Sequence, residues 1–321
     1  MSLLKPVRTL LLCVAPFAFT ACANVSRPGN NATSPDNGTF ALRIYDTKAQ
    51  RFVPFSRLAA AASRVDIVFF GEQHDDPATH AAELAVLASI GERRERVVLS
   101  VEMFERDVQL LLNQYLDGSV SEKDFLAGSR PWDRYTTDYR PLVELSRIRG
   151  WPVVAANVPR RIASAVSRKG LVALDTMSAT ERRYSATQNI CPKDAYYKNF
   201  AALMGDTPGH GASGAQPSAT ELAAATAMTD RFYEAQCVKD ETMGESVANG
   251  LARAGSGAIV FHVDGAFHSD FGLGTAERAR RRAPSANVLI LTAVPLADLS
   301  KANGAEYAKR ADFVLFTRAP K

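Results

Sequence analysis

Residues 67–75 have the sequence IVFFGEQHD, and residues 259–270 have the sequence IVFHVDGAFHSD. Each begins with β-branched and aromatic residues and then opens into Gly-x-x-His, as Gly71 to His74 and as Gly265 to His268. A short apolar run that ends at a glycine is typical of a strand buried on both faces. The chain has five histidines, and the repeated motif places two of them just after two buried strands.

Further apolar runs alternate with segments of helical pattern along the chain. Alternating strands and helices predict an α/β fold, with a largely parallel sheet and helices on both faces. Two short segments, ALRIYD and RFVPF, predict a hairpin at an edge of this sheet. The six runs expected as the other strands are 66–72, 96–104, 151–159, 258–265, 287–294 and 311–317.

Residues 171–252 break the alternation, because they contain no convincing strand. The sequence Ser-Ala-Thr-Glu occurs at 178–181 and again at 218–221, and both copies fit a capping box at a helix start. We therefore expect a helical insertion that lies as a lid over the carboxyl ends of the strands. In its last helix Tyr233, Gln236 and Asp240 share one face, which indicates that this face lines a cavity.

The N-terminus has the features of an export signal. Basic residues precede the apolar run LLLCVAPFAF, and Cys22 follows small residues, as in bacterial lipoprotein signals. The run is too short to span a membrane. We expect a lipoprotein signal peptide at 1–21 with lipidation of Cys22; the alternative is an ordinary signal peptide cut nearby.

The residues after the signal separate the membrane anchor from the folded part. Residues 22–39 are rich in Asn, Ser, Pro and Gly, which predicts a flexible tether. The remaining residues, 40–321, are long enough for one large domain. Ala23, rather than Asp, follows Cys22, and the usual sorting rule for lipoproteins then favours the outer membrane.

Charge and cysteine count narrow the partners and the compartment. The formal net charge is +4, and it falls to +2 once Lys5 and Arg8 leave with the signal (4 − 2 = 2), so the chain offers no reason to expect a nucleic-acid partner. Once Cys13 is removed and Cys22 is lipidated, Cys191 and Cys237 remain. An even pair in an oxidising compartment favours a disulfide, and two buried thiols are the alternative.

Several polar side chains lie at or just beyond the carboxyl ends of the predicted strands. The carboxyl ends of parallel strands meet at one edge of a sheet, where ligands bind, so these side chains should lie together. The two Gly-x-x-His motifs would then form two walls of one pocket, each glycine letting the backbone turn. The residues are Glu72 and His74, Glu102, Asn157 and Arg160, and Asp264 and His268.

Each of these residues also has a simpler role open to it. Glu72 could face the N-terminus of the next helix, and Glu102 could pair with Arg106 or Arg160. His80 is a weaker candidate, because its spacing of six residues from His74 places it on a different helix face.

At these residues the sequence resembles the ChaN-like family of haem-binding lipoproteins, in a superfamily with Tiki and erythromycin-esterase-like proteins. The resemblance runs through nearly the whole mature domain in the family's order. The matching blocks are GEQHDDPATH, SVEMFERDVQLLLNQYLDG, WDRYTTDYRPLVELSRIRGWPVVAANVPRRI, AQCVKDETMGESVA and VDGAFHSDFGLG.

The resemblance implies an iron-regulated haem-binding lipoprotein that takes part in haem and iron uptake at the outer membrane, beside a haem receptor. It also implies tyrosine ligation of the haem iron and formation of a homodimer on haem binding. Tyr197 and Tyr233 are the favoured ligands among four tyrosines of the helical insertion. His74, His268 and Arg160 are the candidates for contacts with the propionates.

The same superfamily also implies a hydrolase as the alternative. In a Tiki-like metalloprotease, His74, Glu102 and His268 would bind a metal, and Glu72 or Glu102 would act as general base. In an esterase-like, metal-free enzyme, His74 would activate water with Glu72 or Glu102 assisting. The chain contains no Gly-x-Ser-x-Gly motif, so a serine nucleophile of that kind is not expected.

Overall fold

The computed structural model describes residues 42–205 and 218–320. The expected signal peptide, Cys22 and the expected tether therefore lie outside the described residues, and so do residues 206–217. No described helix is both long enough and apolar enough to cross a membrane.

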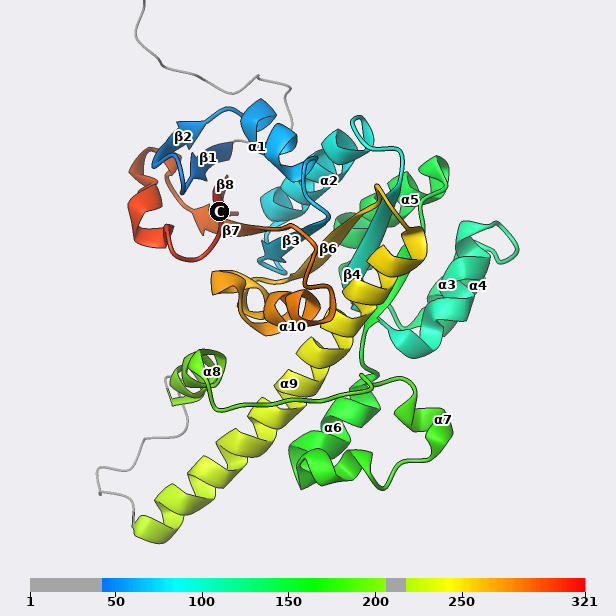
Figure 1. Cartoon of the computed structure of the whole chain (residues 1–321), viewed down its shortest axis with the longest axis vertical. Coiled ribbons are helices and arrows are strands. Elements are labelled where there is room, and N and C mark those ends of the chain that lie inside the picture. Colours follow the sequence, from blue (N-terminus) through cyan, green and yellow to red (C-terminus); the bar gives the residue numbers. More distant parts are fainter. Residues whose placement is uncertain (1–41, 206–217, 321) are drawn as a thin grey trace, which may run out of the picture. The chain divides into compact units, whose positions relative to one another are not determined.

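The fold is built on one eight-stranded mixed sheet, which runs through the centre of the domain (Figure 1). The strand order is β2-β1-β8-β7-β3-β6-β4-β5. The six strands from β8 to β5 pair in parallel, and the hairpin of β1 and β2 adds an antiparallel edge. The strands are β1 Leu42–Asp46, β2 Arg51–Val53, β3 Ile67–Glu72, β4 Val97–Glu105, β5 Val153–Asn157, β6 Ile259–Gly265, β7 Val288–Leu296 and β8 Phe313–Arg318.

The predicted α/β fold is confirmed, and the two opening segments form the centre of the sheet. β3 and β6 are adjacent and parallel, with Glu72 opposite Gly265. Every residue of both strands is buried, because helices cover both faces and leave no polar alternation.

Alternate residues of β3 enter two different cores. Val68 and Phe70 pack with helices α1 to α5, whereas Ile67 and Phe69 pack with α9 and α10. This period of two is the pleat of a strand, and it divides the helices between the faces. The helices are α1 Phe55–Ala62, α2 Pro77–Gly91, α3 Gln109–Leu116, α4 Glu122–Ser129, α5 Arg140–Arg149, α6 Arg160–Lys169, α7 Ala179–Arg182, α8 Ala195–Gly205, α9 Ala219–Ala254 and α10 Gly274–Arg282.

The segment 171–252 holds helices and no strand within its described residues. Ser218 and Glu221 form a complete capping box at the start of α9. At the start of α7, the side chain of Ser178 accepts a hydrogen bond from the backbone N–H of Glu181, which is one half of the capping box. Residues 219–227 of α9 are exposed, but the later turns pack on α10 and the sheet (Figure 1). The insertion therefore ends as one of the covering helices.

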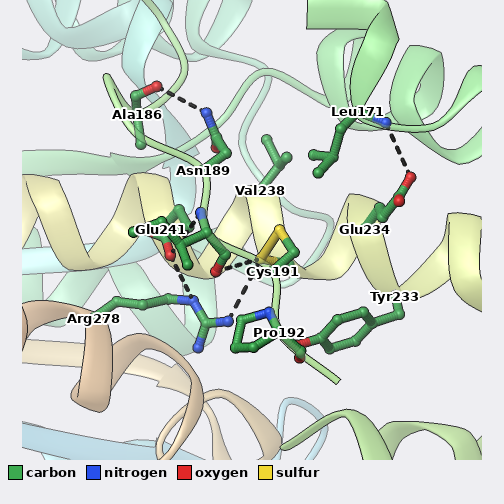
Figure 2. Close-up of a disulfide and its surroundings, with 12 residues drawn as sticks. Leu171, Ala186, Asn189, Cys191, Pro192, Tyr233, Glu234, Val238, Glu241 and Arg278 are labelled. Atoms are coloured by element: carbon green, nitrogen blue, oxygen red, sulfur yellow. Dashed lines mark hydrogen bonds and ion pairs between the residues drawn. A yellow bond between two sulfur atoms is a disulfide. The ribbon is translucent and has the colours of Figure 1, made fainter. Parts of the chain in front are cut away.

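A disulfide joins Cys191, ahead of α8, to Cys237 in the middle of α9. The loop that it closes spans 46 residues of sequence separation. Figure 2 shows the bond between the aromatic ring of Tyr233 and the guanidinium of Arg278. It fixes the approach of α8 to the middle of the long helix.

Candidate functional site

The two Gly-x-x-His motifs interlock at the carboxyl ends of β3 and β6. A Cβ atom at Gly265 would lie 2.9 Å from Nε2 of His74, and a Cβ atom at Gly71 would lie 2.9 Å from Cα of Ala266 and 3.1 Å from Oγ of Ser269. Each glycine thus makes room for the other motif. Neither has a positive φ, so the expectation that they allow a sharp turn is wrong, and close approach is the physical reason for both.

His74 is the half-exposed histidine of this pair. Its Nδ1 faces Oε1 of the buried Glu72, which also accepts a hydrogen bond from the hydroxyl of Tyr139 at 2.7 Å. Its side chain is 49% exposed and packs edge-on against Trp132. Burial lowers the pKa of His74, but the bond to Glu72 and its charge outweigh this and raise the pKa above its ordinary value. Glu72 therefore orients an accessible imidazole.

His268 is buried between two carboxylates. Its Nδ1 lies 2.7 Å from Oδ1 of Asp240, and its Nε2 lies 3.3 Å from Oε1 of Glu102. Burial alone lowers the pKa of His268, yet the two negative charges raise it well above the ordinary value. Both ring nitrogens thus face carboxylate oxygens, an arrangement that favours the charged form of the ring.

The charge of His268 has the reciprocal effect on its partner. Burial raises the pKa of Glu102, but the charge of His268, with a hydrogen bond from the backbone N–H of Gly265 at 2.9 Å, brings the pKa far below the ordinary value. This ion pair is buried. Glu102 does not pair with either predicted arginine, because Arg106 binds Glu245 at 3.0 Å and Arg160 lies exposed at the start of α6.

Two of the three residues on the polar face predicted in the helix of 229–251, Gln236 and Asp240, contact His268. Asp240 binds His268 and also accepts a hydrogen bond from the hydroxyl of Thr275 at 3.0 Å. The amide of Gln236 lies 3.3 Å from the His268 ring. The third residue of the face, Tyr233, is buried and donates its hydroxyl to the carbonyl of Pro192 at 2.6 Å.

His80 belongs to the site, contrary to the expectation from its spacing. Its Nδ1 lies 3.6 Å from Oε2 of Glu72 and 3.1 Å from Oε2 of Glu83, and its Nε2 lies 3.4 Å from Oδ2 of Asp138. The helix α2 passes over the end of β3, so a residue six positions beyond His74 returns to the same carboxylate. The sequence signal for this arrangement is the pair of His80 and Glu83, which are three residues apart on one helix face.

The metal set predicted for a Tiki-like enzyme is not assembled. Nδ1 of His268 faces Asp240 at 2.7 Å and Nε2 faces Glu102 at 3.3 Å, on opposite sides of the ring. Within the described ranges, the group whose ligand atoms lie close enough for one ion is Glu72, His80 and Glu83. His74 and Glu102 remain neighbours across Gly265.

The two favoured tyrosines differ in access. The hydroxyl of Tyr233 is used inside the fold, as described above. Tyr197 is half-buried, and its hydroxyl donates to Oδ1 of Asp230 at 2.8 Å. Lys193 lies over its ring at 5.2 Å and also binds Asp230 at 2.7 Å. Both rings belong to an aromatic cluster on α8, α9 and the turn after β6, formed by Tyr196, Tyr197, Phe200, Tyr233 and Phe267.

The sequence that forms this fold matches a known family. The family model described as haem-binding uptake, Tiki superfamily, ChaN matches residues 58–279. The chain therefore belongs to this family.

Two individual proteins are similar to the chain. The solved structure titled "Cofacial heme binding to ChaN of Campylobacter jejuni" superimposes with a TM-score of 0.59 at 14% identity, covering 89% of this chain and 99% of that one. Protein RETICULATA-RELATED 5, chloroplastic, of Arabidopsis thaliana is 22% identical over 264 residues, or 79% of this chain. The chain spans only 34% of that relative's length.

Proposed function

We propose that this protein binds haem, as an outer-membrane lipoprotein of haem and iron uptake. The observation that carries the proposal is the match of the haem-binding family model to residues 58–279. ChaN of Campylobacter jejuni, which binds haem cofacially, shares this fold, and the similarity supports the proposal.

The chemistry of the aromatic cluster fits a haem. Ferric iron favours an anionic oxygen ligand such as a tyrosinate, and Tyr197 is the favoured tyrosine whose hydroxyl stands at the half-buried edge of the cluster. The rings of Phe200 and Phe267 offer an apolar surface, and their centroids lie 6.2 Å apart. Tyr197 would hold the iron, and Lys193 would hold a propionate.

The other residues expected to contact haem differ in their exposure and in the partners they already have. Tyr233 is a weaker ligand, because its hydroxyl is buried on Pro192. His268 is committed to two carboxylates, and its role is to hold the site together. His74 has a half-exposed ring and stays a candidate for a propionate. Arg160 is exposed at the start of α6 and stays a candidate for a propionate.

The cellular setting is part of the proposal. A lipid anchor on Cys22 and the tether of 22–39 would hold the domain at the outer membrane beside a haem receptor. The exposed first turns of α9, residues 219–227, are a surface on which a second copy could dock once haem is bound. These elements rest on the sequence and on the family.

The test is a titration of the purified domain, residues 40–321, with haemin, followed by absorption and by sedimentation velocity. The proposal predicts saturation at a fixed stoichiometry and a shift from monomer to dimer as haem is added. Non-saturable binding with a domain that stays monomeric would overturn the haem proposal.

A second candidate function is metal-free hydrolysis, and the geometry of His74 favours it. An imidazole whose Nδ1 is held by a buried carboxylate presents Nε2 as a general base, which is the arrangement of His74 and Glu72. The base is active when deprotonated, so the raised pKa of His74 predicts a rate that rises through a pH above the ordinary histidine range. A screen with ester and amide substrates would reject this candidate if His74→Ala retained any activity found.

A further inference from the structure

A buried group of three potential metal ligands lies beside His74. The haem proposal assigns no role to this group. Glu72 comes from the end of β3, and His80 and Glu83 come from α2. Their relative exposures are 2%, 4% and 0%. We infer that these three side chains form a binding site for one divalent transition-metal ion.

The spacing of the ligand atoms is that of a coordination shell. The ligand atoms of the group all lie within 4.8 Å of one another. Nδ1 of His80 lies 3.1 Å from Oε2 of Glu83 and 3.6 Å from Oε2 of Glu72. Ligands bound at about 2.1 Å to a metal lie about 3.0 to 3.4 Å apart in octahedral or tetrahedral geometry. Small side-chain adjustments would therefore admit an ion.

Two oxygens in the group lack partners. Oε2 of Glu72 and Oε1 of Glu83 are buried and accept no hydrogen bond. A buried carboxylate oxygen without a donor is costly. An ion at the centre of the group would satisfy both oxygens at once.

The surroundings orient the ligands as in known metal sites. Nε2 of His80 lies 3.2 Å from the carbonyl oxygen of His74 and 3.4 Å from Oδ2 of Asp138. A metal-bound histidine commonly donates its other N–H to a carboxylate or carbonyl in this way. Tyr139 donates to Oε1 of Glu72, which leaves Oε2 for the ion.

A shared proton is the competing account of the same geometry. Burial, and then the negative charge of Glu72, raise the pKa of Glu83 well above its ordinary value. A protonated Glu83 could therefore bridge the group without a metal. This account leaves one imidazole and two carboxylates at metal-ligand spacing unused, and the experiment below separates the two.

The ligand types indicate which ions suit the site, and the position of the site indicates what a bound ion would do. One imidazole with two carboxylates suits Zn²⁺ or Mn²⁺ better than the soft ions that need thiolates. The site is closed to solvent, so the ion would hold α2 on the end of β3. Because Oε1 of the same Glu72 holds His74, the ion would also fix the position of that exposed ring.

The experiment uses the purified protein without haemin, dialysed against EDTA and then titrated with ZnCl₂ or MnCl₂ by calorimetry. The inference predicts one equivalent bound and a higher thermal midpoint in the metal-loaded protein. Glu83→Gln keeps the shape of the side chain and should weaken binding at least about tenfold, as loss of a direct ligand does. Glu92→Gln, at the exposed end of the same helix, should bind as the wild type does.

Two results of the titrations would overturn the inference. The wild type could bind neither ion, which would leave the shared proton as the account of the group. Glu83→Gln could bind with wild-type affinity, which would place the ion elsewhere. If Glu83→Gln fails to fold, the X-ray absorption fine structure of the Zn²⁺-loaded wild type decides instead. The site requires a single imidazole in an otherwise oxygen shell, and a shell with no imidazole or with more than one would overturn the inference. None of these results depends on haem, so the haem proposal stands or fails separately.

Discussion

At the scale of single residues, the centre of the site is the ion pair that His268 makes with Glu102 and Asp240. All three side chains are buried, so each charge depends on the others rather than on water. The pair connects the end of β6 to β4 on one side and to α9 on the other. It explains why the second Gly-x-x-His motif ends on a histidine that solvent does not reach.

Replacing His268 by Asn should therefore destabilise the domain by about 3–5 kcal/mol, because two carboxylates are left buried without their cation. Urea unfolding measures the loss. Adding Glu102→Gln to the same chain should restore part of it, and a loss under about 1 kcal/mol in the single variant would contradict the assignment.

The pH dependence of that loss has a definite sign. The folded pKa of His268 is raised above 6.5, so its contribution is complete below pH 6.5 and is lost as pH rises through the folded pKa. The folded pKa of Glu102 is lowered below 4.5, so its contribution is present above pH 4.5 and is lost as pH falls through the folded pKa. The difference in free energy of unfolding between the wild type and His268→Asn should be greatest between pH 4.5 and pH 6.5. It should decline at higher and at lower pH.

Tyr197 permits a second prediction at this scale. The hydrogen bond to Asp230, with some burial, raises the pKa of the phenol, and ligation of iron requires loss of that proton. Asp230→Asn removes the acceptor charge and should strengthen haem binding at neutral pH by up to about tenfold for each pKa unit recovered. Haemin titrations at pH 7 and pH 9 check this, since the gain should shrink at the higher pH. Weaker binding in the variant at both pH values would refute the ligand assignment.

The sequence predicted one part of the site and missed another. Glu72, His74, Glu102 and His268 were expected because each lies at or near the carboxyl end of a strand, and parallel strands bring these ends together. His80 was set aside, since helical spacing compares it only with its own helix. Its partner Glu72 comes from a strand, and the angle at which α2 crosses that strand depends on packing that no short pattern records.

At the scale of elements, helices α9 and α10 approach each other closely at Gly244. A Cβ atom at Gly244 of α9 would lie 2.7 Å from Cβ of Arg278 and 2.9 Å from the backbone nitrogen of Ala279. The same approach brings Arg278 beside Glu241, with Nε at 3.3 Å from Oε1. Glycine is therefore needed for packing at a helical position where it lowers helix propensity.

Two glycines on the same helix allow a matched test. Gly244→Ala should cost about 1–3 kcal/mol, because the added methyl pushes α10 away. Gly250→Ala should be neutral or stabilising by up to about 1 kcal/mol, since its nearest contact, Cγ2 of Val154, is an ordinary 3.6 Å away. Thermal unfolding of both variants measures the difference. Equal effects would mean that the contact of α9 with α10 is not as close as described.

The elements themselves were largely predictable. All six apolar runs became the strands expected of them, because burial on both faces leaves a continuous apolar sequence. The extent of α9 was harder to predict. Its first turns are exposed, so no apolar stripe marks them in the sequence. Its last turns pack on α10 and the sheet. One helix therefore belongs both to the insertion and to the core.

At the scale of the whole molecule, one mixed sheet and its covering helices support both the strand-end site and the aromatic cluster. The sheet brings the strand-end residues together, the long helix α9 carries Asp240 into the site, and α8 with the Cys191–Cys237 bond holds the aromatic cluster beside it. Haem would lie on that cluster, outside the buried ion pairs. Changes at Tyr197 should thus alter haem binding and leave the free energy of unfolding within about 0.5 kcal/mol, as expected of a surface side chain.

The most direct test of this account is the resonance Raman spectrum of the ferric haem complex in the wild type, in Tyr197→Phe and in Tyr184→Phe. Tyr184 is a half-buried tyrosine of the same insertion whose hydroxyl contacts Arg183. The account predicts iron–phenolate bands in the wild type and in Tyr184→Phe, and their loss in Tyr197→Phe. Iron–phenolate bands that persist in Tyr197→Phe, or that are absent from the wild type, would contradict it.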